Sequence, residues 1–207
     1  METIKEKRTK SQVAILEAAK ALFWKYGIGK VTVEEICEHA EVSKMTFYRN
    51  FENKLHVAEI VLVGLAEKGL ADYHAIMKAE IPFNEKIQRL VQMEHDHSEN
   101  LSEDFIRDIY GADDPKLKNI LEELQKKTSE ALRKDLSEAQ KKGEIRKDLK
   151  IDFIIYMING LNEKLLDERL TSLFGNTQEL AVELTNFVFY GIMPKYKSNN
   201  SNKIESK

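Results

Sequence analysis

Residues 32–55 read TVEEICEHAEVSKMTFYRNFENKL. Within this stretch, Thr32 is followed three residues later by Glu35. That spacing is the pattern of a capping box, in which each side chain bonds the backbone of the other, so a helix is expected to begin directly after Thr32. The helix is short, because polar and turn-forming residues follow Ala40.

A tight turn at Glu41 and Val42 separates this helix from the next. Ser43 is suited to cap a second short helix, which should end near Phe51. Asn53 is then the expected cap of a much longer helix that stops before Pro82.

A longer helix precedes the pair and is expected from about Lys5 to Tyr26. Gly27 follows it, at the place where a helix commonly ends in a left-handed residue. Its apolar side chains recur on one helical face: Ile15, Ala18, Ala19, Leu22, Phe23 and Tyr26.

Two short helices joined by a tight turn behind a supporting helix form a DNA-reading helix-turn-helix unit. The first residues of the second short helix then lie at the base edges of the major groove. Those residues are Lys44, Met45 and Thr46, next to the cap Ser43. A lysine can donate to guanine or to a phosphate, and a threonine offers a methyl group to thymine.

The bulk composition limits the other classes of protein. The 207 residues carry a net charge of −3, with 42% hydrophobic and 32% charged residues and a single cysteine. No apolar run is long enough to span a membrane, and no apolar segment near Met1 resembles a secretory signal, so a cytoplasmic protein without a membrane partner is expected. Residues 1–60 contain ten Lys or Arg and nine Asp or Glu, so DNA would be held by a few placed cations.

The rest of the chain predicts further helices and an all-α fold. Few prolines and glycines interrupt it, and no alternating strand pattern occurs. The expected divisions are a three-helix DNA-binding domain over 1–52, a helical ligand-binding and dimerisation domain over 53–194, and a disordered tail over 195–207. The helices expected beyond Pro82 cover about 84–98, 102–111, 115–143, 148–174 and 177–190.

Residues 10–56 resemble the tetracycline-repressor (TetR) family of bacterial transcriptional regulators. The matching pattern is Ile15-x-x-Ala18-Ala19-x-x-Leu22-Phe23-x-x-x-Gly27, Thr32-Val33-x-x-Ile36, and Ala40-x-Val42-Ser43-x-x-Thr46-Phe47-Tyr48-x-x-Phe51-x-x-Lys54-Leu55. Two positions depart from it: Glu41 stands where the family often has glycine, and Met45 where it usually has a small residue.

The resemblance implies roles for particular side chains. It assigns base reading to Lys44, Met45 and Thr46. It assigns phosphate contacts to Thr32, Ser43, Tyr48 and Lys54, with Arg8 and Lys10 as further candidates. Phosphate contacts of this kind fix the register of a protein on DNA without reading its sequence.

The last two predicted helices carry wide apolar faces, which suggests burial on more than one side. We expect them to pair with a second copy of the chain, as they do in the family. The expected interface residues are Ile154, Ile158, Leu180, Leu184, Phe187 and Val188.

A pocket for an apolar or aromatic effector is expected in the body. Its candidate lining residues are Met93, His97, Phe105, Tyr110, Tyr156 and Asn159. Asn159 is a polar exception in an apolar run, and its amide can bond either a ligand or the same residue across the dimer axis.

Other residues with reactive side chains carry less weight. Glu94, His95, Asp96 and His97 form a polar run, but the two histidines point about 200° apart on a helix, so no metal site is expected. Cys37 is expected in the core.

The predicted function is a homodimeric regulator, most simply a repressor that binds a palindromic DNA operator and is released by a small molecule. An architectural DNA-binding protein without ligand sensing is the alternative, although it would need a more basic surface. No catalytic constellation, phosphate-binding loop or cofactor motif is present, so neither an enzyme nor a cofactor is expected.

Overall fold

The computed structural model describes residues 8–99, 101–111 and 114–194, and over these residues the all-α prediction is confirmed. No strand occurs in the described ranges. The helices are α1 (Lys10–Tyr26), α2 (Val33–His39), α3 (Lys44–Asn50), α4 (Lys54–Lys78), α5 (Phe83–Ser98), α6 (Glu103–Tyr110), α7 (Pro115–Lys142), α8 (Ile151–Lys164), α9 (Glu168–Thr171) and α10 (Thr177–Ile192).

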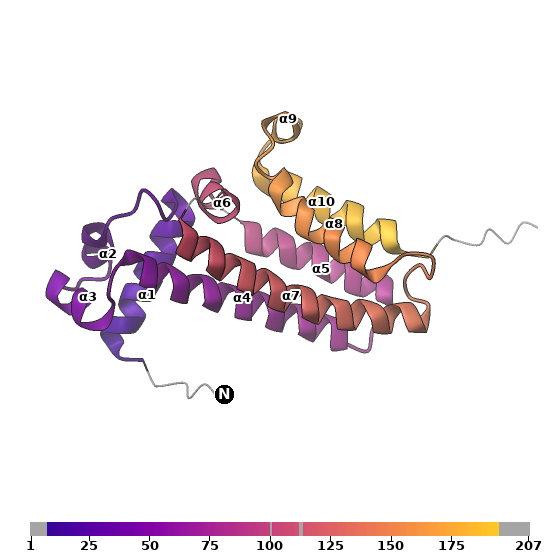
Figure 1. Ribbon diagram of the computed structural model, residues 1–207, viewed down its shortest axis with the longest axis horizontal. Coiled ribbons are helices and arrows are strands. Elements are labelled where there is room, and N and C mark those ends of the chain that lie inside the picture. The colour runs from indigo at the N-terminus through magenta and orange to yellow at the C-terminus, as the bar shows by residue number, and fades with distance from the viewer. Residues whose placement is uncertain (1–7, 100, 112–113, 195–207) are drawn as a thin grey trace, which may run out of the picture.

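The helices form a small head and a long body (Figure 1). The head consists of α1, α2 and α3, and α4 leads from it along the whole body beside α7. Helices α8 and α10 lie together on one side of the body and α10 packs on α5, while α6 packs on α1 at the junction of the two parts.

The core of the head continues into the body. Phe23, Ile36 and Phe47 are fully buried there, and they share one apolar cluster with Val57 of α4 and Phe105 of α6. Burying these large side chains is the main stabilising contribution to the head. The head is therefore held to the body by side-chain packing as well as by the chain itself, and the division at 52/53 stays a prediction.

The start of α1 corrects the expectation of a helix from Lys5. Thr9 has extended backbone angles, and its hydroxyl accepts a hydrogen bond from the backbone N–H of Gln12 at 3.2 Å. The side-chain oxygen of Gln12 accepts a hydrogen bond from the backbone N–H of Thr9 at 2.8 Å, which completes a capping box. The helix therefore begins at Lys10, and residues 5–7 lie outside the described part.

The single helix expected over 148–174 is also wrong. It begins at Ile151 and stops at Lys164, where short backbone bonds form turns. The Asp167 carboxylate then accepts a bond from the backbone N–H of Arg169 at 3.0 Å and starts the separate one-turn helix α9. A side chain that caps the backbone in this way competes with the continuing helix.

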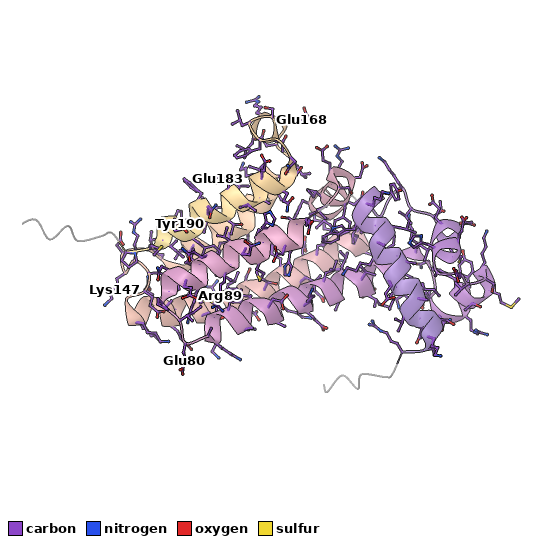
Figure 2. All side chains as sticks on the ribbon, turned by 180° about the vertical axis from the view of Figure 1, so that it is seen from behind. Glu80, Arg89, Lys147, Glu168, Glu183 and Tyr190 are labelled. Atoms are coloured by element: carbon purple, nitrogen blue, oxygen red, sulfur yellow. The ribbon has the colours of Figure 1, made fainter. Side chains whose placement is uncertain are left out.

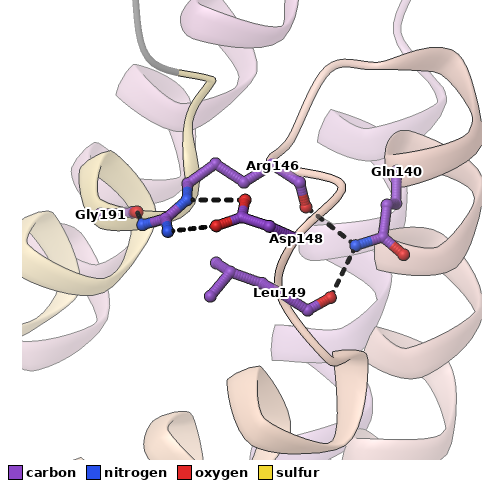
Figure 3. Close-up of polar contacts among 5 residues, drawn as sticks. All are labelled: Gln140, Arg146, Asp148, Leu149 and Gly191. Carbon is purple, nitrogen blue, oxygen red and sulfur yellow. Dashed lines mark hydrogen bonds and ion pairs between the residues drawn. The ribbon is translucent and has the colours of Figure 1, made fainter.

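The loop between α7 and α8 is fixed to the end of α10 (Figure 3). The Arg146 guanidinium donates two bonds to the Asp148 carboxylate, at 3.1 and 2.7 Å, and a third to the carbonyl of Gly191 at 3.3 Å. The side-chain amide of Gln140 donates to the carbonyls of Arg146 and Leu149, each at 2.8 Å. These bonds satisfy backbone groups where the chain reverses direction.

In the described ranges, no helix combines the length and the apolar character that crossing a bilayer requires. The tail predicted to be disordered, 195–207, lies outside the described residues.

Candidate functional site

Helices α2 and α3 form the predicted helix-turn-helix. The capping box is present, since Thr32 accepts from the backbone N–H of Glu35 at 3.2 Å and donates its own N–H to the Glu35 carboxylate at 2.7 Å. Thr32 thereby lowers the pKa of Glu35. Ser43 caps α3 through the backbone N–H of Thr46 at 3.1 Å, so both helix starts are fixed as the sequence predicts.

The turn between the two helices requires a left-handed residue. Glu41 has a φ of 53°, the one positive value at a non-glycine position in the described part of the chain. An L-residue with a Cβ is strained in this conformation. The backbone N–H of Val42 still reaches the carbonyl of Cys37 at 3.0 Å, so the turn closes with good hydrogen-bond geometry.

Helix α3 presents one face to solvent and buries the other. Phe47 is fully buried and packs against Phe51 at a ring-centroid distance of 5.8 Å, which locks the helix onto the head. On the opposite face, Met45 is 81% exposed and Tyr48 is 57% exposed. Such large apolar groups are costly to leave in water, so their exposure indicates a surface that meets a partner.

The predicted base-reading residues lie together on this face. Lys44 is exposed, and its ammonium forms an ion pair with Glu34 of α2. Glu34 raises the pKa of Lys44, and Lys44 lowers that of Glu34. Thr46 is half-buried, with its hydroxyl 3.0 Å from that of Ser43. The Lys44 ammonium and the Thr46 hydroxyl thus already have bonding partners in the protein, and a base would have to compete with these partners.

The predicted phosphate-contacting residues divide into two groups. Arg8, Lys10 and Tyr48 are exposed and can reach a phosphate, and Ser43 is exposed while its hydroxyl bonds the backbone N–H and the hydroxyl of Thr46. Thr32 is also exposed, but its hydroxyl donates to Glu35 at 2.8 Å.

Lys54 differs from the other predicted phosphate contacts because it is partly buried and already bonded. Its ammonium donates to the carbonyls of Gly29 and Val31, at 3.0 and 2.6 Å, and burial lowers its pKa. A lysine has three donors, so at most one remains for DNA. Its main role here is to join the start of α4 to the loop between α1 and α2.

Helix α6 holds the same loop from the body side, an arrangement that the sequence did not reveal. The Asp108 carboxylate accepts the backbone N–H of Gly29 at 2.9 Å, and Asp104 pairs with Lys30 at 2.6 Å. Gly27 has a φ of 83°, and a Cβ there would stand 2.7 Å from Asp108. Glycine is therefore required at this position for both its conformation and the close approach.

Two adjoining cavities open in the body next to α6. The larger cavity, about 1650 Å³, lies between α1, α4, α6, α7 and α8, and the smaller, about 460 Å³, is lined by α4, α5, α7, α8 and α10 with two residues of α6. His97, Ile106, Tyr110 and Ile158 line both. Pockets for drug-sized ligands have volumes of roughly 300–1,000 Å³, and of these two cavities the smaller one falls in that range.

Five of the six predicted pocket residues line these cavities: Met93, His97, Phe105, Tyr110 and Asn159. Tyr156 does not, because it is 76% exposed on the outer side of α8, and its assignment to the pocket is wrong. The Asn159 amide donates to the Ser129 hydroxyl of α7 at 3.1 Å, a partner within the chain that the sequence did not predict.

The predicted interface residues also require correction. Ile154, Leu180 and Val188 are buried within the chain, and Ile158 and Leu184 line the cavities. Phe187 alone of the predicted set is highly exposed, at 72%. Phe153 and Tyr156 of α8 and Tyr190 of α10 are also more than half exposed. The outer face was misassigned because both sides of these helices are apolar.

The remaining candidates take structural roles. Cys37 is buried, and burial raises the pKa of its thiol, which is the state of an unreactive core cysteine. His95 lies 3.5 Å from Asp96, and His97 lies 3.2 Å from Asp72. No cluster of three or more metal-ligating side chains occurs in the ranges that the structure describes.

The geometry of the head is that of a helix-turn-helix unit, and known proteins share both this segment and the overall fold. Residues 15–59 match the family described as bacterial regulatory proteins, tetR family. Over 63 residues the chain is 33% identical to the HTH-type transcriptional regulator TtgR of Pseudomonas putida. That match spans 30% of this chain and only 30% of the length of the relative.

Two solved structures share the whole fold. The fatty acid degradation regulator FadR from Bacillus halodurans has a TM-score of 0.72 and 18% identity, covering 90% of this chain and 98% of that one. The transcriptional regulator FadR from Bacillus subtilis, in complex with stearoyl-CoA, has a TM-score of 0.67 and 17% identity, covering 87% and 98%. Residues 15–59 are thus similar to the tetR family of bacterial regulatory proteins, and the chain as a whole shares its fold with these two structures.

Proposed function

We propose that the chain is a sequence-specific DNA-binding transcriptional regulator that acts as a homodimer, most simply as a repressor that a small molecule releases from its operator. The observation that carries the proposal is the exposed face of α3, where Lys44, Met45, Thr46 and Tyr48 stand on a helix fixed at its start by Ser43 and underneath by Phe47. A rigid, exposed second helix of this kind is what major-groove reading requires.

The exposed apolar face of α8 and α10 supports the dimer. Phe153, Tyr156, Phe187 and Tyr190 are all more than half exposed and lie on two helices that pack against each other. Figure 2 shows Tyr190 on the outer side of the body. A second copy offers the same face, so a two-fold pairing covers all of it at once.

Such a pairing would leave two heads free. Two heads related by a two-fold axis would read half-sites roughly 34–36 Å apart, or a multiple of that spacing.

The cavities and α6 support release by a small molecule. Helix α6 contributes Phe105 and Tyr110 to the cavity walls, and on its other side Asp104 and Asp108 hold the loop of the head. A ligand that moves α6 or the adjoining α4 would shift the heads relative to each other. Because it favours one of two arrangements, it would change operator affinity by a population shift. The stearoyl-CoA of the Bacillus subtilis FadR complex makes acyl compounds one class to test.

Selection of bound duplexes from a random DNA pool tests the function. We expect a palindromic site, and gel-shift titration should then give a large ratio of specific to random-duplex affinity. Lys44→Ala and Thr46→Ala should each reduce the free-energy difference between specific and random-duplex binding by ~1–3 kcal/mol, since they remove base contacts. Tyr48→Phe should weaken both kinds of binding alike, because its hydroxyl is assigned to phosphate.

An architectural DNA-binding protein is the alternative, and the same titration separates the two. Its affinity would depend on salt but barely on sequence. If the selection yields no enriched site and Thr46→Ala leaves the ratio unchanged, the regulator proposal is wrong.

A further inference from the structure

The smaller cavity has an unusual charge pattern for a pocket inside an apolar body. Among the residues described, its walls carry neither lysine nor arginine, and the acidic group is Glu94 of α5. The one other group that can carry charge there besides the phenols is His97, whose Nε2 lies 3.2 Å from the Asp72 carboxylate. Any positive charge on His97 is therefore shared between Asp72 and Glu94 rather than matched to Glu94 alone.

Glu94 itself is without a matched partner. Within the described ranges, no hydrogen bond or ion pair reaches its carboxyl, although its own backbone carbonyl accepts from the Ser98 hydroxyl at 2.7 Å. Burial raises the pKa of Glu94, and the charge of His97 opposes that rise. Glu94 is partly buried, and a partly buried carboxylate without such a partner gains from a cation brought next to it.

The surrounding side chains suit a cation with an apolar body. Tyr73, Tyr110 and Phe189 line the smaller cavity and offer aromatic faces, which attract positive charge. Partial burial and the nearby Glu94 raise the pKa of Tyr110, so its hydroxyl stays protonated. Most other lining residues are Leu, Met, Ala, Ile or Val, and these would cover an alkyl or aromatic part of the ligand.

We infer that the smaller cavity binds a lipophilic cation, an organic ammonium compound whose charge lies at Glu94 and whose apolar part fills the space between α4, α5 and α10. An anion in the same position would face the Glu94 carboxyl with no lysine or arginine in the cavity wall to neutralise it. This inference rests on the proposed function, since it names the class of effector for the same regulator.

Three ligands that share one chain length but differ in charge test the inference. Decyltrimethylammonium, decan-1-ol and decanoate are titrated below their micelle concentrations into the full chain, and binding is measured by calorimetry. We expect the cation to bind at least about ten-fold more tightly than the alcohol, and the anion most weakly. Glu94→Gln should remove the preference for the cation to within about two-fold and leave the affinity for decan-1-ol unchanged.

Three further variants locate the effect. Glu80→Gln removes an exposed carboxylate at the far end of the body, which Figure 2 labels, and should leave the preference intact. Gly69→Leu places a side chain against His97, since a Cβ at Gly69 would stand 4.0 Å from that ring, and should weaken all three ligands. Gly64→Leu, in the same helix with nothing within 4 Å, should weaken none.

The operator assay separates failure of this inference from failure of the proposed function. If the chain binds a selected operator but decanoate or decan-1-ol binds as tightly as the cation, or if Glu94→Gln keeps the preference, the inference is overturned. If no operator is found while the cation preference depends on Glu94, the regulator proposal fails and the binding site stands. Operator release by the cation in wild type but not in Glu94→Gln would support both.

Discussion

Replacing Glu41 by glycine should stabilise the protein, although it removes a side chain. Glu41 adopts a φ of 53° in the turn between α2 and α3, where a Cβ costs ~1–2 kcal/mol. Glycine avoids that cost, but it gives the unfolded chain more conformational entropy to lose on folding, and this reduces the gain by ~0.4–1 kcal/mol. The expected gain is therefore ~0.5–1 kcal/mol in the free energy of unfolding, or about 1–4 °C in the melting temperature of a chain of this size.

Thermal unfolding followed by circular dichroism at 222 nm measures this gain, and Glu41→Ala is the matched control. Alanine removes the same charge but keeps the Cβ, so it retains most of the strain and should melt close to wild type. Both variants remove a carboxylate beside the DNA-facing surface and should raise affinity for random duplex equally. The strain argument fails if Glu41→Gly melts below wild type, or if Glu41→Ala gains as much.

Three further predictions follow from single contacts. Glu34→Gln should release Lys44 from its ion pair and raise affinity for random duplex with a steeper salt dependence; an unchanged salt slope in fluorescence anisotropy would contradict this. Asp108→Ala should leave ligand affinity at its wild-type value but weaken ligand-driven operator release by about ten-fold, and the control Glu103→Ala, at an exposed position, should leave release unchanged. Equal release by the two variants would show that α6 does not transmit the effect of the ligand. In sedimentation, Phe187→Glu and Tyr156→Glu should each convert a dimer of about twice 23.9 kDa to monomer, whereas Tyr26→Glu in the head should leave the dimer intact. A monomeric wild type would contradict the proposed interface.

Local signals in the sequence predicted most of the fold. Thr32 with Glu35, Ser43, Asn53, Ser102 and Asp114 each cap the helix that was expected to follow them. Capping depends on residues only two or three positions apart, so one sequence contains all the information needed. The sequence placed the turn at Glu41 and Val42 in the same way, but it left open whether the backbone there is left-handed, and the φ of 53° at Glu41 comes from the structure.

Contacts between distant residues could not be predicted in this way. Asp108 reaches Gly29 across 79 positions, and Gln178 bonds the carbonyl of His95 across 83. The outward face of α8 was misjudged for a related reason: Ile154 and Tyr156 are both apolar, and only the packing of α8 against its neighbours decides which is buried. Glu94 appeared in the sequence as part of a polar surface run, and only the placement of α10 beside α5 encloses it.

The bonds from Arg146 to the end of α10 determine where the protein can be extended. The backbone N–H of Arg146 donates to the carbonyl of Ile192 at 2.9 Å, and its guanidinium reaches Gly191, so the last turn of α10 is anchored from outside. This turn lies at the end of the body opposite the head, whereas α1, which begins shortly after residue 8 in the sequence, belongs to the head and contacts α3 (Figure 1). A fluorescent protein or affinity tag joined after residue 194 would therefore sit far from the duplex and pull on an anchored helix end. The same fusion before residue 8 would stand beside the proposed DNA-binding surface and hinder the predicted phosphate contacts of Arg8 and Lys10.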